Sequence, residues 1–293
     1  MVLDILGRLS RGPIIRAVAP RTTLALLLGL ITLSDVVSSQ PQGFGASRTA
    51  LATVVDARGR SIVDVEIDDF VVRETGQARE VLSVRVADYP VAVVLDNGPG
   101  AGQDFVAIRQ AAARFIGRVG RRPISVALAG PPHLIATLDD DRAAVARALD
   151  NAAPGLSGDG LFEAIVESAR SIAESGSSFS AIVVVSASPL ASVPPELLTP
   201  ILGTGAVVYV VVAGSAQAGQ STDALRALAD QTGGQFTTVF SAASYPVALD
   251  RLADRLAPQL LLEYVVPTGS TSGNDVQLGV RIPGARVIGL GVK

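Results

Sequence analysis

The chain has 293 residues, of which 48% are hydrophobic and 17% are charged, and its net charge at pH 7 is −3. This is enough apolar material for a large core and too much for a disordered chain, while the slight acidic excess gives no reason to expect a nucleic-acid partner. Aromatic residues make up only 4% and tryptophan and cysteine are absent, which argues against a base- or sugar-stacking surface and excludes disulfides and thiolate chemistry.

Residues 1–39 predict an export signal. Arg8, Arg11, Arg16 and Arg21 precede an uncharged apolar run at 23–33, which is the order of regions in a signal peptide. Val37 and Ser39 stand at the −3 and −1 positions of a cleavage site before Gln40. The apolar run is short for a membrane span, so cleavage and retention as an uncleaved anchor both stay open. We expect an extracytoplasmic protein (periplasmic, secreted or membrane-anchored) that associates with the membrane only through an uncleaved N-terminus.

Residues 40–88 predict a β-rich flank. Strands are expected at 49–56 and 62–67, followed by a hairpin that joins 68–74 to 80–86 across a turn at Thr75-Gly76. The strand pattern returns in residues 260–293, with strands expected at 260–266, 275–282 and 287–292. Because isolated hairpins are only marginally stable, we expect the two flanks to pair in one small β-sandwich-like subdomain.

Residues 89–259 alternate between buried strands and amphipathic helices, which predicts an α/β domain inserted between the flanks. Apolar runs predict strands at 91–95, 124–129, 133–137, 181–185, 206–212 and 235–239. Helical periodicity predicts helices at 105–119, 139–149, 162–172, 222–232 and 247–256. We expect a doubly wound, mostly parallel sheet with helices on both faces.

Asp96 is the first candidate site residue, because it directly follows the apolar run Val91–Leu95 and precedes a glycine-rich turn, Asn97-Gly98-Pro99-Gly100. A buried parallel strand carries such a residue to the carboxyl edge of its sheet, where open α/β folds bind ligands. One carboxylate in this position suggests a metal site or the remains of one.

Several segments together resemble the von Willebrand factor type A family, in the form found in exported bacterial proteins. The resemblance covers most of residues 49–293 and rests on the order and spacing of its pieces. The pieces are VVDARGRSIVDVEIDDFVVRETGQAREVLSV, YPVAVVLD, LSGDGLFEAI, LADQTGGQF and YVVP followed by VQLGVRIPGARV. The resemblance implies an α/β domain that binds other proteins at the carboxyl edge of its sheet.

The family's metal-ion-dependent adhesion site is where this chain departs from the pattern. Asp96 matches the first Asp of the family's Asp-x-Ser-x-Ser motif, but Gly98 and Gly100 stand where its two hydroxyls belong. Asp159 stands near the family's Thr, and Ala187 or a neighbouring Ser stands where its last Asp belongs. Since glycine offers no side-chain oxygen to a hard dication, we predict a degenerate site with no bound metal. A weak cation site that uses Asp96 and Asp159 is the alternative.

Two other chemistries fit the sequence poorly. The glycines at 98–102 follow a strand as in a dinucleotide fingerprint, but the spacing is G-x-G-x-G and no acid ends the next strand at 124–129. The one histidine, His133, has no nucleophile at a recognisable spacing. We therefore expect no enzymatic activity and no small-molecule cofactor.

The sequence predicts an exported, non-enzymatic adhesion or scaffold module that binds a protein partner at the carboxyl edge of the sheet. The expected contact surface consists of the loops at 97–102, 154–160, 186–193 and 213–221, which are rich in Gly, Ser, Ala and Pro. The candidate partner-binding residues are Asp96, Asn97, Gly98, Gly100, Asp159, Ser186 and Ser188.

Overall fold

The computed structural model describes residues 45–156, 160–187, 195–214, 223–269, 273 and 275–293. The predicted export signal at 1–39 lies outside the described residues. Within the described ranges, no helix has the length and apolar character needed to cross a membrane.

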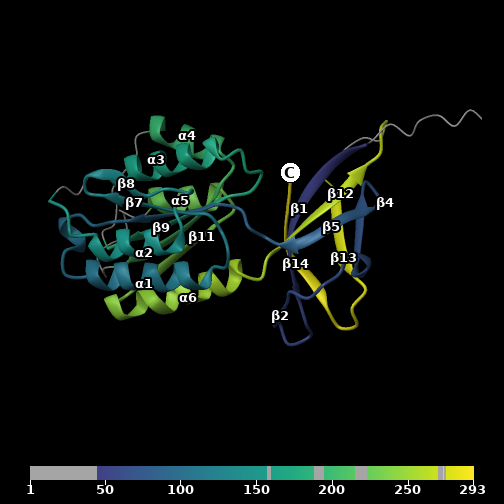
Figure 1. Cartoon of the computed structure of the whole chain (residues 1–293), viewed down its shortest axis with the longest axis horizontal. Coiled ribbons are helices and arrows are strands. Elements are labelled where there is room, and N and C mark those ends of the chain that lie inside the picture. Colours follow the sequence, from purple (N-terminus) through teal and green to yellow (C-terminus); the bar gives the residue numbers. More distant parts are fainter. Residues whose placement is uncertain (1–44, 157–159, 188–194, 215–222, 270–272, 274) are drawn as a thin grey trace, which may run out of the picture. The chain divides into compact units, whose positions relative to one another are not determined.

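The centre of the α/β part is a sheet of six strands in the order β11-β10-β9-β6-β7-β8 (Figure 1). Its strands are β6 (Val91–Leu95), β7 (Ile124–Ala129), β8 (Pro132–Ala136), β9 (Ala181–Ser186), β10 (Val207–Ala213) and β11 (Gln235–Val239). Neighbouring strands run parallel except at β8, which is antiparallel to β7 and ends the sheet. The mixed α/β character predicted from the sequence is confirmed, and β8 makes the sheet mixed.

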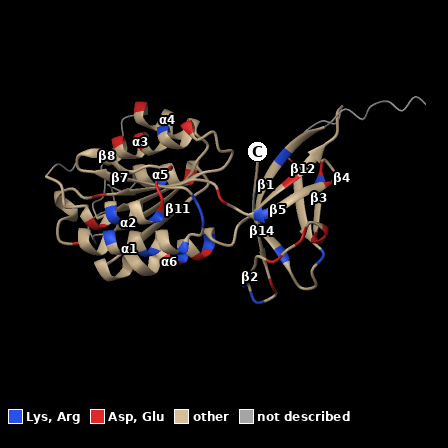
Figure 2. Ribbon diagram, in the orientation of Figure 1, with Lys and Arg blue, Asp and Glu red and all other residues tan. Residues whose placement is uncertain are grey.

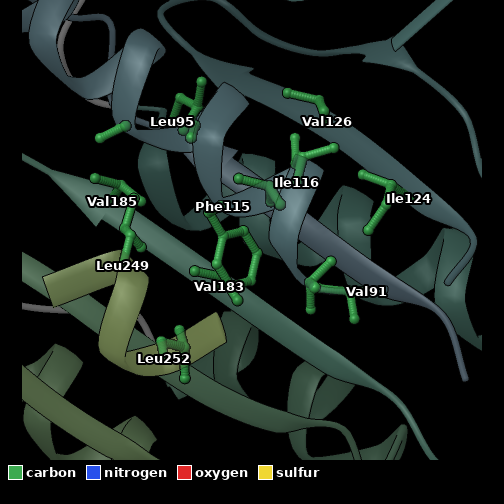
Figure 3. Close-up of a cluster of buried hydrophobic side chains, with 14 of the residues drawn as sticks. Val91, Leu95, Phe115, Ile116, Ile124, Val126, Val183, Val185, Leu249 and Leu252 are labelled. Atoms are coloured by element: carbon green, nitrogen blue, oxygen red, sulfur yellow. The ribbon is translucent and has the colours of Figure 1, made fainter. Parts of the chain in front are cut away.

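Helices pack against both faces of this sheet (Figure 1). One face is covered by α1 (Phe105–Arg118), α2 (Arg142–Asn151) and α6 (Tyr245–Leu256), and the other by α3 (Leu161–Glu174), α4 (Pro195–Gly203) and α5 (Asp223–Gln231). Figure 3 shows the first core, where Phe115 of α1 lies among Val91, Val183 and Leu252. Strands β6, β7 and β9 are buried on both faces, and their sequences are accordingly almost entirely apolar; the exceptions are Ser125 in β7 and Ser186 at the end of β9.

The sequence pattern predicts no helix at 195–203, where α4 lies. Pro195 begins this helix and Pro200 stands inside it, and an internal proline lowers helix propensity steeply. Ile201 is nevertheless fully buried in the core that α3 and α5 share. Tertiary packing therefore outweighs local propensity at this position.

The flanks form two antiparallel sheets that share a third core. The first has the order β14-β1-β12-β5 with β2 beside β1, and the second has the order β13-β3-β4. The strands are β1 (Ala46–Val55), β2 (Ser61–Ile62), β3 (Phe70–Glu74), β4 (Gln77–Arg79), β5 (Val81–Val86), β12 (Leu260–Val266), β13 (Val276–Val280) and β14 (Arg286–Val292). Strands from the two ends of the chain therefore lie side by side, with β1 between β12 and β14.

Two local expectations for the first flank are wrong. The strand expected at 62–67 is reduced to β2, because the acidic segment after it forms a 3-10 turn, Ile67–Asp69, in which Glu66 and Asp69 cap each other. The expected hairpin partner at 80–86 pairs elsewhere: β3 turns at Thr75-Gly76 into β4, whereas β5 pairs with β12 of the other sheet. Both turn residues have positive φ, which suits a tight two-residue hairpin.

A buried carboxylate joins the two sheets of the flanks. Glu74 of β3 is fully buried and accepts hydrogen bonds from Arg48 of β1 and from Nε of Arg79 of β4, the latter at 3.2 Å. Arg48 also donates to the carbonyl of Gly273 at 3.0 Å. Since a buried charge is tolerated only when it is paired, these contacts compensate for the burial of Glu74, and the bond to Arg48 links β3 to β1 of the other sheet.

The linkers that enter and leave the α/β part are hydrogen-bonded to each other. The N–H of Ala87 donates to the carbonyl of Gln259 at 2.8 Å, and the Tyr89 hydroxyl donates to Gln259 Oε1 at 2.5 Å. The Arg122 guanidinium lies 4.0 Å from the centre of the Tyr89 ring and donates to the carbonyl of Leu256 at 2.6 Å. These contacts keep the two linkers together at the amino edge of the sheet.

The tyrosines give a spectroscopic test of this packing. All four tyrosines of the sequence are buried, and burial raises the pKa of each, that of Tyr89 to about 12. A tyrosine with an ordinary pKa of 10.0 ionises first in the unfolded chain, so stability that is fully present below pH 10 is lost as the pH rises from 10 towards 12. Titration at 295 nm should show little phenolate in the native protein at pH 10, against about half in concentrated guanidinium chloride. Equal phenolate fractions in both solutions would contradict the buried arrangement.

Removal of residues 267–293 should destroy cooperative folding of the flanks. The truncation deletes β13 and β14, which exposes the edges of β3 and β1 and the apolar faces of their shared core. We expect aggregation or loss of the sharp calorimetric transition. An insertion of two glycines in the turn between β13 and β14 keeps both strands and serves as the control. A soluble truncated chain with an unchanged melting midpoint would show that these strands are dispensable.

Candidate functional site

The carboxyl edge of the central sheet holds the residues that the sequence singled out. Asp96 follows β6 and Ser186 ends β9, and their side chains meet: the Ser186 hydroxyl donates to Asp96 Oδ2 at 2.7 Å. The N–H of Gly98 donates to Asp96 Oδ1 at 3.0 Å. Asp96 is only 5% exposed and Ser186 is fully buried. Both oxygens of this carboxylate therefore accept hydrogen bonds inside the protein.

Tyr245 connects α6 to the same edge. Its hydroxyl donates to the carbonyl of Ser186 at 2.9 Å, and its side chain is fully buried. Burial raises the pKa of Tyr245, and the negative charges of Asp104 and Asp96 raise it further. The phenol therefore stays protonated near neutral pH and acts as a donor to this backbone carbonyl.

Asn97 joins three loops at this edge. Its Nδ2 donates to the carbonyls of Gly130 (3.2 Å) and Ala153 (3.0 Å), and its Oδ1 accepts from the N–H of Gly130 at 2.6 Å. Its own carbonyl accepts from the N–H of Gly155 at 2.6 Å. Since Asn97 is 2% exposed, these bonds hold the loops after β6, β7 and α2 in one arrangement.

Two glycines allow the loop between α2 and α3 to approach β7 this closely. A Cβ at Gly155 would lie 1.7 Å from the carbonyl oxygen of Gly130, just after β7, and a Cβ at Gly160 would lie 2.4 Å from the carbonyl oxygen of Ala129 at the end of β7. Neither distance is compatible with a side chain, so glycine is required by the contact itself.

The structure brings together four of the predicted site residues and leaves two outside its description. Asp96, Asn97, Gly98 and Ser186 are buried at the edge. Gly100 lies on the exposed side of the 3-10 turn Pro99–Ala101. Asp159 and Ser188 lie outside the described residues, as do most of the loops at 186–193 and 213–221.

The described part of the edge offers few ligands to a metal. Across the described ranges, no group of three His, Cys, Asp or Glu side chains is arranged to hold an ion. Gly98 and Gly100 present no side-chain oxygen, and the oxygens of Asp96 are already engaged. Asp96 and Ser186 alone do not supply the roughly six oxygens that a hard dication requires.

Exposed apolar side chains surround this polar centre. Among the described residues of the α/β part, five large apolar side chains are exposed: Val106, Leu156, Leu202, Phe240 and Val247. Four of these lie at the carboxyl edge, because α1 and α6 begin there, β11 ends there and the α2–α3 loop is held there by Asn97. Leu156 is 99% exposed and Phe240 is 86% exposed. The predicted contact loop at 154–160 includes Leu156, whereas sequence reasoning missed Val106, Phe240 and Val247.

A groove of about 840 Å³ lies between β8 and α2 beside this edge. We call it the β8–α2 groove. Its wall includes Asn97, His133, Ile135, Ala148 and Leu156, and none of its fourteen lining residues is Asp, Glu, Lys or Arg. Strands β7 and β8 likewise carry no charged residue (Figure 2). The groove is therefore uncharged, and the Asn97 hydrogen bonds hold the part of its wall that contains Gly130 and Ala153.

Comparison with solved structures finds von Willebrand factor type A proteins. A von Willebrand factor type A protein from Catenulispora acidiphila is 11% identical, with a TM-score of 0.48, over 85% of this chain and 74% of the other. The vWF domain of the type V pili tip protein Mfa5 from Porphyromonas gingivalis is 10% identical, with a TM-score of 0.43, over 58% of this chain and 95% of the other. Proximal thread matrix protein 1 from the mussel byssus is 14% identical, with a TM-score of 0.46, over 60% of this chain and 48% of the other.

The first two of these structures are named as von Willebrand factor type A or vWF domains, the family that the sequence resembles. No protein-family model matches the chain, and no curated protein matches it in sequence. At such low identities the likeness concerns the fold alone, and the function must be argued from this chain's own residues.

Substitution of Gly155 should disturb the whole edge. We expect Gly155→Ala to lower the free energy of unfolding by about 2 kcal/mol or more, since the loop must shift and leave buried partners of Asn97 unpaired. The matched control is Gly117→Ala, which introduces the same methyl group on α1, where nothing lies within 4 Å. It should raise stability by about 0.5–1 kcal/mol. Urea unfolding of both variants measures the difference, and equal effects would show that the close approach is unimportant.

Proposed function

We propose that this chain is an exported, non-enzymatic interaction module that binds a protein partner at the carboxyl edge of its central sheet, without a bound metal. The observation that carries the proposal is the grouping of exposed apolar side chains around a polar centre whose own hydrogen bonds are already made.

The exposed apolar side chains at the carboxyl edge, which we call the apolar rim, support the proposal that the partner is a protein. Leu156, Phe240, Val106 and Val247 come from four separate segments and share one end of the sheet, whereas Leu202 alone lies near the other end, where α4 terminates. Exposed apolar residues that gather on one face mark an interaction surface more often than scattered ones do. Exposed Phe and Leu side chains bury a large apolar area when a partner covers them.

The small number of oxygen ligands at the carboxyl edge supports the proposal that binding requires no metal. The resemblance implies a metal at this edge, but Gly98 and Gly100 replace two of the ligands that the family motif requires. In the described structure, the two carboxylate oxygens of Asp96 accept hydrogen bonds from the Gly98 N–H and the Ser186 hydroxyl. A cation at Asp96 would find no side-chain oxygen at either glycine and would gain few protein ligands. The described residues therefore do not fit the family's metal site.

The non-enzymatic part of the proposal is supported by the surroundings of two described residues, His133 and Ser186, whose side chains could take part in acid–base or nucleophilic chemistry. His133 is exposed, and its Nδ1 lies 2.7 Å from the carbonyl oxygen of Pro131, which occupies that nitrogen as a donor. The Ser186 hydroxyl is fully buried and donates to Asp96 Oδ2, so it is not accessible to a substrate, as a nucleophile must be. Export rests on the N-terminal sequence pattern alone.

A thermal-shift titration with Mg²⁺, Mn²⁺ and Ca²⁺ tests the metal-independent part of the proposal. Weak binding would stabilise the fold little at physiological concentration, so we expect the melting midpoint to stay within about one degree at sub-millimolar metal. Asp96→Ala, run in parallel, controls for the site. A saturable rise of several degrees that Asp96→Ala abolishes would restore the cation-dependent alternative with Asp96 and Asp159.

Replacement of the apolar rim tests the partner-binding part. Leu156→Ser with Phe240→Ser should abolish capture of a defined set of proteins from the native envelope fraction, while EDTA should leave the capture by the unchanged protein intact. The matched control, Leu202→Ser with Ile288→Ser, removes two exposed apolar side chains away from the edge and should have no effect. The rim proposal fails if both double variants capture the same proteins equally well.

A further inference from the structure

Strand β8 ends the central sheet at one side. It pairs with β7 through Ala129↔Pro132, Leu128↔His133, Ala127↔Leu134 and Val126↔Ala136. Within the described residues no strand pairs with its other side. An open strand edge presents backbone N–H and C=O groups to which an extended segment can bond.

The side chains of β8 alternate between the two faces of the sheet, and a groove lies on each face. Ile135 packs towards the core under α1 and α2 and lines the β8–α2 groove. Leu134 packs towards the opposite core, under α3; it borders the β8–α2 groove and also lines a second groove of about 400 Å³. We call this second one the β8–α3 groove. A strand added beside β8 would point its successive side chains into these two grooves in turn.

The two grooves differ in charge. The β8–α2 groove contains no charged side chain. The β8–α3 groove is lined by the carboxylates of Asp139, Glu167 and Glu174 and by the single guanidinium of Arg170. Three negative charges against one positive charge leave this groove net acidic, so it is complementary to basic side chains.

Hydrogen bonds to its wall give the β8–α2 groove its shape without a partner. Asn97 bonds to Gly130 and Ala153 on its wall, and Arg109 donates to the carbonyls of Asp150 and Ala152, at 2.7 and 3.0 Å, where α2 ends. Binding to a preformed groove loses less conformational entropy than binding to a loose one. Leu156, fully exposed at the end of this groove, connects it to the apolar rim.

We propose that the partner docks as an extended strand beside β8, with alternating side chains that are apolar towards the β8–α2 groove and basic towards the β8–α3 groove. This inference rests on the proposed function and specifies the chemistry of the partner. The backbone would bond to the β8 edge, and the alternation of the segment would match the opposite character of the two grooves.

Synthetic peptides of about nine residues, a length typical of a strand, test this with the full chain. The first peptide alternates Val and Lys. The second alternates Val and Glu, and the third has the composition of the first with its valines and lysines in separate blocks. We expect only the first to bind in calorimetry and to slow amide hydrogen exchange at residues 133–136.

A charge reversal tests the acidic groove. Asp139→Lys with Glu174→Lys changes two exposed side chains of that groove and should weaken the Val–Lys peptide about tenfold, because two surface attractions become repulsions. The same variant should gain affinity for the Val–Glu peptide. The matched control, Glu196→Lys with Asp230→Lys on α4 and α5, makes the same change in net charge on exposed positions elsewhere and should leave the order of affinities unchanged.

Three results would overturn the inference. One is equal binding of the alternating and blocked Val–Lys peptides, and another is exchange protection at β11, the opposite edge of the sheet, instead of β8. The third is a dimer in sedimentation that protects β8 without peptide, because a second copy would then be the occupant. If these occur while Leu156→Ser with Phe240→Ser still abolishes partner capture, the proposed function stands and the docking mode is wrong.

Discussion

The arrangement of the carboxyl edge depends on the side-chain amide of Asn97. A primary amide has two donors and an acceptor, and here they bond to Gly130 and Ala153, which follow different elements of the chain. Because the amide is buried, an unmade bond would cost about 1–3 kcal/mol, so the loops after β6, β7 and α2 adopt one shape together. The wall of the β8–α2 groove and the position of Leu156 both follow from that shape.

At the carboxyl edge, the polar and the apolar side chains face in different directions. Its polar atoms are turned inward, where Asp96, Ser186 and Tyr245 form a chain of hydrogen bonds that links β6, β9 and α6. Its apolar side chains are turned outward on the surrounding loops and helix starts. A carboxylate that stabilises a turn is a structural element, whereas in the related metal motif the same position helps to hold an ion.

The β flanks place a different constraint on the chain. Their first sheet contains β1 and β5 from before the α/β part and β12 and β14 from after it. The insertion must therefore return its two ends to nearly the same point, and the bonds between Tyr89 and Gln259 and between Ala87 and Gln259 occur where it does so. Arg122, which contacts Tyr89 and the end of α6, extends this junction into the α/β core.

Local patterns in the sequence determined the identity of most elements. The apolar runs at β6, β9 and β10 indicate doubly buried strands, and the helical stripes of α1, α3 and α6 indicate which faces cover them, because burial on a sheet imposes those periods directly. The sequence also identified Asp96 and Ser186 as edge residues, since position after a parallel strand follows from the strand itself. It did not reveal α4, because the internal Pro200 argues against a helix even though Ile201 beside it is buried in the core.

Only the tertiary structure decided the long-range pairings. The split of 77–86 into β4 and β5, which belong to different sheets, depends on β3 and β12 and has no local signal. The role of Asn97 depends on carbonyls 33 and 56 positions away, and the contrast between the two grooves at β8 depends on α2 and α3 lying on opposite faces. Contacts of this kind are set by how elements pack in space, and residue type and periodicity along the chain carry no record of them.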